Sequence, residues 1–379
     1  MRTTCNIFLL LCLFACTQGS KNKEKDIKTY TVAWENISSP KVFFADIDTA
    51  YFIPLETNDS SQIGEISQLN VSDKLVLSDR KPQSILQFSL DGHFLSAHKA
   101  IGNGPGEYVR IDGMYVDKNK DHILVLDAIQ NKVLTYDTNF KFIEEKHTPV
   151  PFGAMAFSMI EDSTFVYEEG IGTVKSDLKY CLFVQPPNGE TRHFLPFEKT
   201  MSIHFSPRQS LYHVDDALVF VPTYNDTIYN VFEDRVEPRM RIDFGEQWVD
   251  EAFVYNQALG KGPMLFMQKL ADQNFIYFFN LMENKTHIYM DFYYKGGAYV
   301  SVIDKKDNSN TLVKFSDPDA QMKPLASHGD YFVFPLAQSE FARIADSNNY
   351  TFAGKASMVE INNKLNEESN PVLMFVKFK

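Results

Sequence analysis

Leu75-Val76-Leu77-Ser78-Asp79 decides the fold, together with Ser84-Ile85-Leu86-Gln87-Phe88 and the segment from Phe94 that follows the turn Leu90-Asp91-Gly92-His93. Each segment is a short apolar run bounded by turn residues, which is a pattern typical of β-strands. Asp and Gly at the second turn supply the backbone conformations that tight hairpins require. The stretch therefore predicts successive antiparallel strands.

The same pattern returns at an offset of 48 residues, so that positions 75–95 align with positions 123–143. Asp79 falls on Asp127, and the apolar residues on both sides of it also coincide. Fainter copies follow at 163–195, 217–243, 274–292 and 331–378. A spacing of about 45–55 residues with three or four short strands per copy is typical of propeller blades. We count five to six copies and predict an all-β fold, a β-propeller of six blades with mainly four antiparallel strands each.

A propeller ring is commonly closed by strands from both chain ends in one blade. We expect Tyr30–Trp34 and Ala50–Leu55 to pair with the strand-like segment Val372–Lys379. Helices are predicted only at Glu246–Leu259 and Ser339–Asp346, as insertions between blades.

The N-terminus has the layout of a secretory signal peptide. Met1-Arg2 precedes an apolar run from Ile7 to Phe14, which is too short for a helix that spans a bilayer. The run ends in Leu13-Phe14-Ala15-Cys16, which resembles the lipobox of bacterial lipoproteins. We therefore predict a signal peptide (1–15), a lipidated Cys16 with a flexible polar tether (16–29), and a propeller domain (30–379). The alternative is an ordinary cleaved signal peptide in which Cys16 is incidental.

The anchor indicates a place in the cell envelope. In lipoproteins of Gram-negative bacteria, Asp directly after the lipidated Cys favours the inner membrane, and Thr17 stands there instead. We expect an outer-membrane lipoprotein that faces either the periplasm or the outside.

Composition excludes several classes of protein. The net charge of −12 disfavours nucleic acid, which is bound largely through Lys and Arg at phosphates. Three of the four cysteines lie at or before Cys16, so the mature domain keeps Cys181 without a disulfide partner. We predict no metal and no cofactor, because the nine His residues are scattered and thiolates do not cluster.

Two further motifs carry a family resemblance: Gly102-Asn103-Gly104-Pro105-Gly106-Glu107-Tyr108, and Asn225-Asp226-Thr227-Ile228-Tyr229 with Ile242-Asp243-Phe244-Gly245. With the repeat, they make the chain similar to the six-bladed propeller lipoproteins of Bacteroides-type bacteria, which are related to NHL-repeat propellers. This resemblance implies a fold and a compartment but no established reaction. The Gly102–Tyr108 segment lacks the Lys-Ser/Thr of a phosphate-binding loop, so we interpret it as a connector between blades.

Asp79 and Asp127 end equivalent strands and allow two interpretations. In the first, they belong to a ring of carboxylates that holds a cation. In the second, which we favour, each caps its own turn by accepting hydrogen bonds from backbone N–H groups.

The sequence contains no recognisable catalytic motif. Our leading hypothesis is a membrane-anchored binding or scaffold module for a protein, peptide or glycan partner. The alternative is a hydrolase or lyase, lactonase-like, with a metal-dependent site at the channel mouth.

Overall fold

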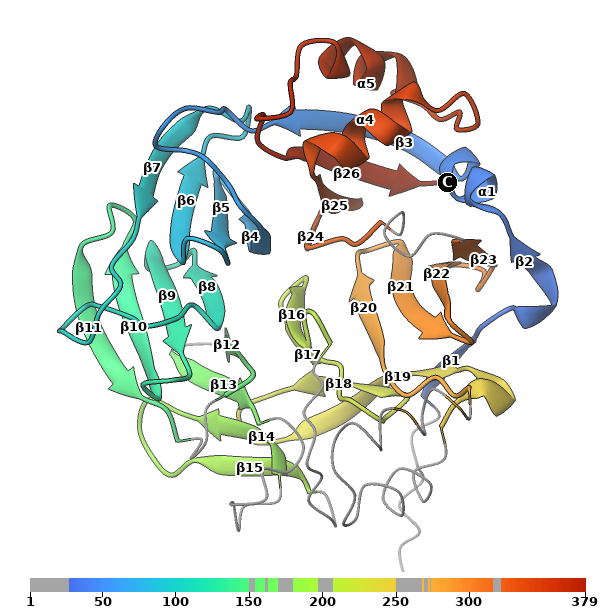
Figure 1. Cartoon of the computed structure of the whole chain (residues 1–379). Helices are drawn as coiled ribbons and strands as arrows, with labels where there is room; N and C mark the ends of the chain where they lie inside the picture. The colour runs from blue at the N-terminus through green and yellow to red at the C-terminus, as the bar shows by residue number, and fades with distance from the viewer. Residues whose placement is uncertain are drawn as a thin grey trace, which may run out of the picture.

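The computed structural model describes residues 27–149, 154–160, 163–169, 180–196, 207–249, 268, 272, 274–315 and 322–379. In this part of the chain, six separate β-sheets stand in a ring, as Figure 1 shows. Neighbouring sheets contact each other along one terminal strand of each sheet, so these strands are the innermost ones. The predicted six-bladed β-propeller is confirmed.

The first three blades contain four antiparallel strands each. From the inside outwards, blade 1 has β4 (Ile66–Val71), β5 (Leu75–Asp79), β6 (Ser84–Phe88) and β7 (Phe94–His98). Blade 2 has β8 (Gly113–Asp117), β9 (His122–Asp127), β10 (Lys132–Asp137) and β11 (Phe142–His147). Blade 3 has β12 (Ala156–Ile160), β13 (Thr164–Glu168), β14 (Tyr180–Gln185) and β15 (Arg192–Pro196).

The other three blades each take an outer strand from the N-terminal segment. Blade 4 has β16 (Leu211–Val214), β17 (Ala217–Phe220), β18 (Thr227–Val231), β19 (Val236–Asp243) and β1 (Lys28–Thr31). Blade 5 has β20 (Phe279–Glu283), β21 (His287–Tyr294), β22 (Gly297–Asp304), β23 (Asn310–Phe315) and β2 (Ile37–Ser38). Blade 6 has β24 (Ala326–His328), β25 (Tyr331–Leu336), β26 (Val372–Phe378) and β3 (Ile47–Pro54).

Strands from the two chain ends close the ring in blade 6. β3 pairs antiparallel with β26 from Ile47 opposite Phe378 to Pro54 opposite Val372, as predicted for Ala50–Leu55. The prediction for Tyr30–Trp34 was wrong, because β1 pairs parallel with β19 in blade 4 instead. The outer edge of β19 has free backbone groups to which a strand from the chain start can add, and such edges do not show in local sequence.

The helices lie at the periphery of blades 5 and 6. α1 (Pro40–Ala45) buries Phe43 and Phe44 beside β23 and β3, whereas α4 (Gln338–Asp346) and α5 (Lys355–Asn362) connect β25 to β26. The helix predicted at Ser339–Asp346 is therefore confirmed, but it is an insertion within blade 6 rather than between blades. At Glu246–Leu259, only Glu246 and Gln247 are helical, in the short 3-10 helix η2 (Gly245–Gln247). The prediction is wrong for Trp248 and Val249, which are extended and pair with Ile276, and residues 250–259 lie outside the described residues. A second short 3-10 helix, η1 (Trp34–Asn36), follows β1.

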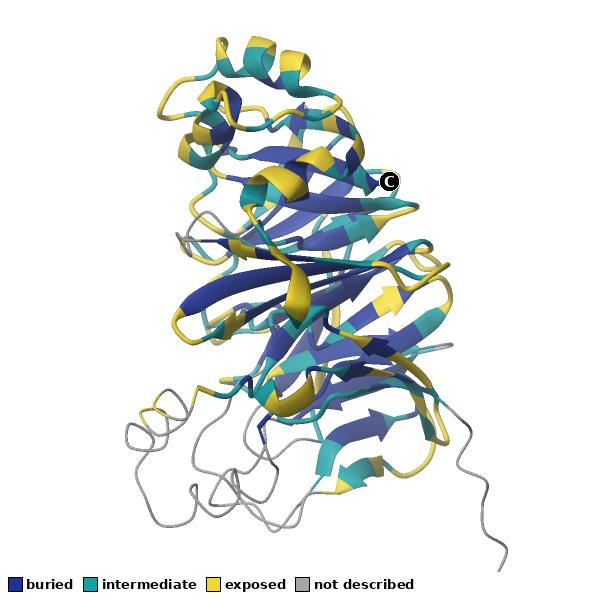
Figure 2. Cartoon of the chain, turned by 90° about the vertical axis from the view of Figure 1, so that its right-hand side faces the viewer, coloured by how far each residue is buried: buried dark blue, intermediate teal, exposed yellow. Residues whose placement is uncertain are grey.

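Burial follows the position of each strand in its blade. Every residue of β5, β6 and β13 is buried, because the middle strands of a blade pack against neighbouring blades on both faces. The outer strand β11 is largely exposed and carries Glu144, Glu145 and Lys146. Figure 2 shows the same division between a buried interior and exposed turns and helices.

Candidate functional site

The innermost strands surround a central channel, and blade 4 projects into it. In Figure 1, β16 lies towards the middle of the ring. The backbone N–H of Arg208 donates to Asn280 Oδ1 at 2.7 Å, and the guanidinium group forms an ion pair with Asp291, with an N–O distance of 3.0 Å. The amide of Gln209 donates to the backbone carbonyl of Leu325 in front of β24. The segment before β16 therefore crosses from blade 4 to blades 5 and 6.

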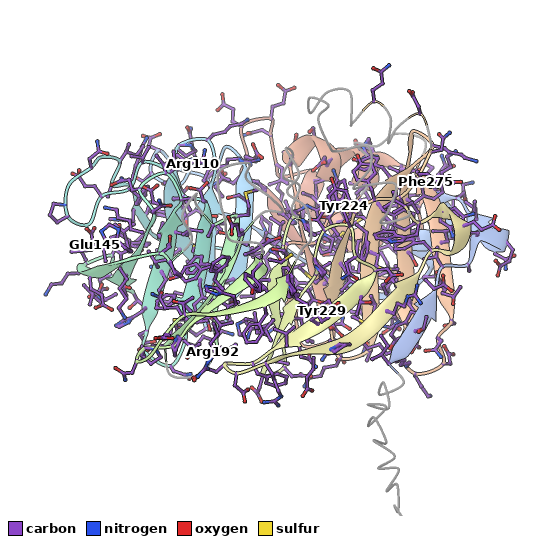
Figure 3. All side chains as sticks on the ribbon, turned by 90° about the horizontal axis from the view of Figure 1, so that it is seen from below. Arg110, Glu145, Arg192, Tyr224, Tyr229 and Phe275 are labelled. Carbon is purple, nitrogen blue, oxygen red and sulfur yellow. The ribbon has the colours of Figure 1, made fainter. Side chains whose placement is uncertain are left out.

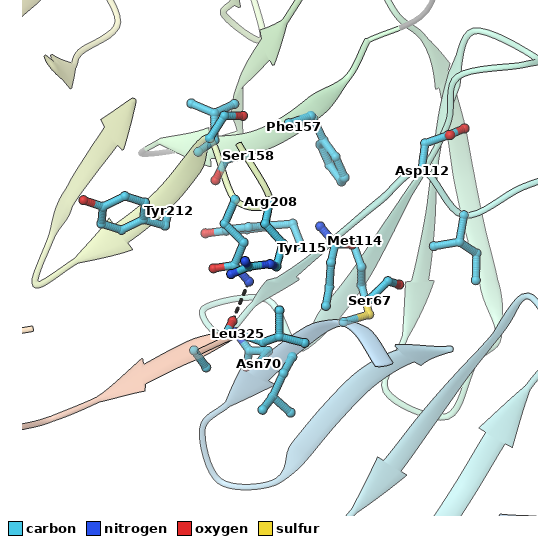
Figure 4. A pocket seen from close by; sticks show the side chains of 18 of the residues that line it. Ser67, Asn70, Asp112, Met114, Tyr115, Phe157, Ser158, Arg208, Tyr212 and Leu325 are labelled. Carbon is cyan, nitrogen blue, oxygen red and sulfur yellow. Dashed lines mark hydrogen bonds between the residues drawn. The ribbon is translucent and has the colours of Figure 1, made fainter. Parts of the chain in front are cut away.

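The remaining part of the channel is a pocket of about 1190 Å³. β4, β8 and β12 form one wall, and the segment 207–213 forms the opposite wall. Figure 4 shows side chains from these strands, among them Ser67, Tyr115, Phe157 and Arg208, around one space. Pockets of about 300–1,000 Å³ hold drug-sized ligands, so this space is large enough for an oligomeric one.

One end of the pocket is rich in paired charges. This end, which we call the mouth, is the one at which the innermost strands begin. Arg80 pairs with Glu65 at 3.4 Å and Arg110 with Asp112 at 2.6 Å. Burial raises the pKa of Asp112, against the effect of its hydrogen bonds to Ala128 and Arg110. Since these charges are balanced, the mouth offers hydrogen-bonding groups without a strong net field.

Three neighbouring blades bring a polar cluster together inside the pocket. Ser158 Oγ on β12 lies 3.1 Å from His213 Nε2 on β16, and the Tyr115 ring on β8 lies 5.7 Å from the His213 ring. The His213 side chain is accessible from the channel, yet it is enclosed by the channel walls. This enclosure lowers the pKa of His213, and the charge of Lys118 acts in the same direction, whereas a hydrogen bond with the Met159 backbone opposes it.

A second ionic cluster joins blades 4 and 5 beside the pocket. The buried carboxylate of Glu283 accepts hydrogen bonds from Arg239 at 2.7 Å and from the Tyr212 hydroxyl at 3.3 Å, and Lys305 lies 2.5 Å away. With its charge matched in this way, Glu283 fixes the two blades relative to each other.

Asp79 and Asp127 are buried turn caps, as we favoured. In each, the carboxylate ties the turn after its strand to the segment that enters the innermost strand of the same blade. The N–H donors are Gly64, Glu65 and Lys81 for Asp79, and Val109, Ile129 and Gln130 for Asp127. Asp127 also accepts a hydrogen bond from the Gln130 side-chain amide at 2.9 Å, so both carboxylates serve their own turns.

The Gly102–Tyr108 segment is a connector between blades 1 and 2, as predicted. Tyr108 is buried and donates its hydroxyl hydrogen to the carbonyl of Gln83 at 3.0 Å. Gly106 has φ +74°, and a Cβ there would lie 2.8 Å from the Phe142 ring, so only glycine fits.

Other predicted features concern the anchor and metal ions. The signal peptide, Cys16 and nearly all of the tether lie outside the described residues. Burial raises the pKa of Cys181 to about 12, so its thiol is a poor nucleophile. Where the structure describes the chain, no three His, Cys, Asp or Glu side chains are grouped to hold a metal. In the same part, no helix has the length and apolarity that a membrane span needs.

Sequence reasoning missed Tyr115, Ser158, Arg208 and His213. Each lies in a segment of mixed polarity without a motif of its own, and they meet only because the ring brings separate blades together. The one signal in the sequence was their position near the start of a blade. The aligned repeat segments do not contain the innermost strands, so this signal was not used.

Fold and pocket define a six-bladed propeller with a ligand-sized central pocket. The family model described as "Domain of unknown function (DUF4934)" matches residues 36–377, and the chain belongs to this family. No curated protein shows significant similarity to it.

Solved structures show the same architecture. A Bacteroides fragilis protein described as exported is 22% identical over 93% of this chain and 99% of its own, with a TM-score of 0.79. A DUF4221 family member from Bacteroides vulgatus is 13% identical over 88% of this chain and 97% of its own, with a TM-score of 0.49. The resemblance to six-bladed propellers of Bacteroides-type bacteria is thus confirmed for the fold.

Proposed function

We propose that this chain is an exported lipoprotein whose propeller binds a partner in its central pocket, as a binding or scaffold module for a protein, peptide or glycan. The observation that carries the proposal is the pocket of about 1190 Å³ between β4, β8, β12 and the segment 207–213. A segment that narrows the channel from one side creates a concave, one-sided pocket, which is the usual shape of a ligand site.

The lining suits a ligand with both polar and apolar groups. Paired side chains such as Arg110 with Asp112 can each donate and accept hydrogen bonds, and Phe157 and Met155 add apolar surface nearby. Arg208 is held by the buried Asp291, so its guanidinium is already ordered before a ligand arrives. Such preorganisation lowers the entropic cost of binding.

The envelope location rests on the lipobox-like Leu13-Phe14-Ala15-Cys16, and the exported B. fragilis structure supports it. We propose further that the anchor lies in the outer membrane and that the propeller is related to NHL-repeat propellers. β1 runs parallel to β19, which ends on the mouth side of the ring, so the chain enters β1 from the opposite side. Figure 3 shows these two faces, with Arg110 on the mouth face and Arg192 on the other. The pocket mouth would then point away from the membrane.

Ligand capture tests the binding function. The mature protein is incubated with an envelope extract of its own host, washed, and measured by native mass spectrometry. We expect a discrete mass adduct that disappears on denaturation. A protein that retains neither a small molecule nor a peptide nor a protein would contradict a binding role.

The lipid anchor is tested by Cys16→Ser. We expect this variant to lose incorporation of radiolabelled palmitate and to leave the membrane fraction, because the thiol that accepts the lipid is gone. Cys12→Ser, within the same predicted signal peptide, is the matched control and should keep both properties. Undiminished labelling of Cys16→Ser would show that the anchor assignment is wrong.

A further inference from the structure

We propose that Ser158 and His213 form a nucleophile and general-base pair that cleaves a small ester or lactone held in the central pocket. This goes beyond binding, and it needs no metal ion. It rests on the same pocket as the proposed function, and the experiment below separates the two.

The distance between the two groups carries the proposal. Ser158 Oγ and His213 Nε2 are 3.1 Å apart, within the range of about 2.6–3.2 Å that activates a nucleophile. Both residues line the pocket, and they come from adjacent innermost strands, β12 and β16. A serine and a histidine in contact at the wall of a ligand-sized pocket are the minimum that acyl transfer requires.

The surroundings orient His213 and keep it ready to accept a proton. The Tyr115 ring packs against the imidazole, with 5.7 Å between the ring centroids. Enclosure in the channel lowers the pKa of His213, so the ring is neutral at pH 7 and can act as a base.

Lys118 and the edge of β12 can stabilise the negative charge that develops on the carbonyl oxygen of the substrate. The charge of Lys118 already acts on His213, and Lys118 lines the same pocket. β12 pairs with β13 on one side only, so alternate backbone N–H groups face the channel. Donors of this kind stabilise an oxyanion in acyl transfer.

The reaction balances without a further reactant except water. Ser158 Oγ bonds to the carbonyl carbon while its proton moves to His213 Nε2, and the C–O bond to the alkoxide breaks as His213 returns that proton to it. Water then releases the acid and restores the serine. Ser158 is only 3% exposed, which favours small acyl groups and lactones over bulky esters.

A fluorophosphonate probe tests this directly on the mature protein, because it phosphonylates activated serines. We expect labelling that maps to Ser158 by peptide mass spectrometry and is absent in Ser158→Ala. His213→Gln should slow labelling by about 10²–10⁴-fold, the usual share of a general base. Ser301→Ala is the matched control, since Ser301 is a buried strand serine outside the pocket, hydrogen-bonded to Asn310. Thermal unfolding of each variant reports whether it folds.

Three results overturn the proposal: no labelling above the heat-denatured protein, labelling that persists in Ser158→Ala, or an equal rate in folded His213→Gln. Each of them leaves ligand capture by the pocket untouched, so failure of the reaction is distinguishable from failure of the binding function.

Discussion

Glu169 shows at the level of one residue how burial sets a pH dependence. It follows β13 and is buried, and its carboxylate oxygens have no hydrogen-bond partner among the described residues. Burial raises its pKa from 4.5 to about 7. Glu168 and the Cys181 thiol lie close by, and Glu168 accepts a hydrogen bond from Ser210.

The direction of the effect follows from proton linkage. The folded state holds this proton more tightly than the unfolded state does. The contribution of Glu169 to the free energy of unfolding is therefore most favourable below pH 4.5, and it is lost as the pH rises from there to about 7. The full cost above pH 7 is up to about 3 kcal/mol.

The substitution Glu169→Gln removes the ionisable carboxyl group and therefore tests this pH dependence. We expect the free energy of unfolding in urea to rise by about 1–3 kcal/mol at pH 8 and by much less at pH 5. Glu144→Gln, at an exposed position on β11, should change neither value. An equal effect of Glu169→Gln at both pH values would contradict a buried, ionising carboxylate.

Also at this scale, Asp79 and Asp127 were predictable and His213 was not. The aspartates recur at the repeat offset, and their partners are backbone groups of their own blade. The partners of His213 are Ser158 and Tyr115, which lie on two other blades. A property of one residue in one repeat is visible in the sequence, whereas a contact between repeats is not.

At the scale of elements, blade 6 holds the ring closed. β3 and β26 are far apart in the sequence, yet they pair in continuous register from Thr49 opposite Lys377 to Pro54 opposite Val372. Buried apolar side chains of both strands, such as Ile53 and Phe375, lie in one core cluster.

A disulfide across this pair tests the closure. In a Cys181→Ser background, Thr49→Cys with Lys377→Cys should oxidise readily, because both residues are partly exposed and directly opposite. A bridge between such distant positions should stabilise the fold by about 2–4 kcal/mol, and reduction should reverse this. Thr49→Cys alone is the control. Two free thiols after oxidation, counted with a thiol reagent, would refute the pairing.

Elements with a strong apolar run were predictable, and those of mixed polarity were not. The repeat was recognised from four strands that are buried on both faces, namely β5, β6, β9 and β10. The innermost strands alternate or mix polar residues, as in β4 with Ser67, Gln68 and Asn70, because their edge faces a solvated channel. β1 carries a plausible strand pattern, but its partner β19 is set by the shape of the whole ring.

At the scale of the whole molecule, the N-terminal segment wraps the outer edges of blades 4, 5 and 6 in succession through β1, β2 and β3. Blades 1, 2 and 3 carry no such added strand among the described residues. The fold was therefore predictable from its repeat, whereas the asymmetric pocket was not, because it depends on the segment 207–210 in front of β16, which crosses to blades 5 and 6.

The central claim is that the pocket, and no other surface, binds the partner. Met155 lines the pocket and is 42% exposed, so Met155→Trp should fold and narrow the space. Ile143→Trp is the matched control, since Ile143 is 45% exposed on the outer strand β11.

The deciding measurement is the dissociation constant of the captured ligand for these two variants and the unmodified protein, by isothermal titration. We predict at least about tenfold weaker binding for Met155→Trp, equivalent to about 1.4 kcal/mol, and an unchanged value for Ile143→Trp. Unaltered binding by Met155→Trp, or a loss caused by Ile143→Trp instead, would contradict the account.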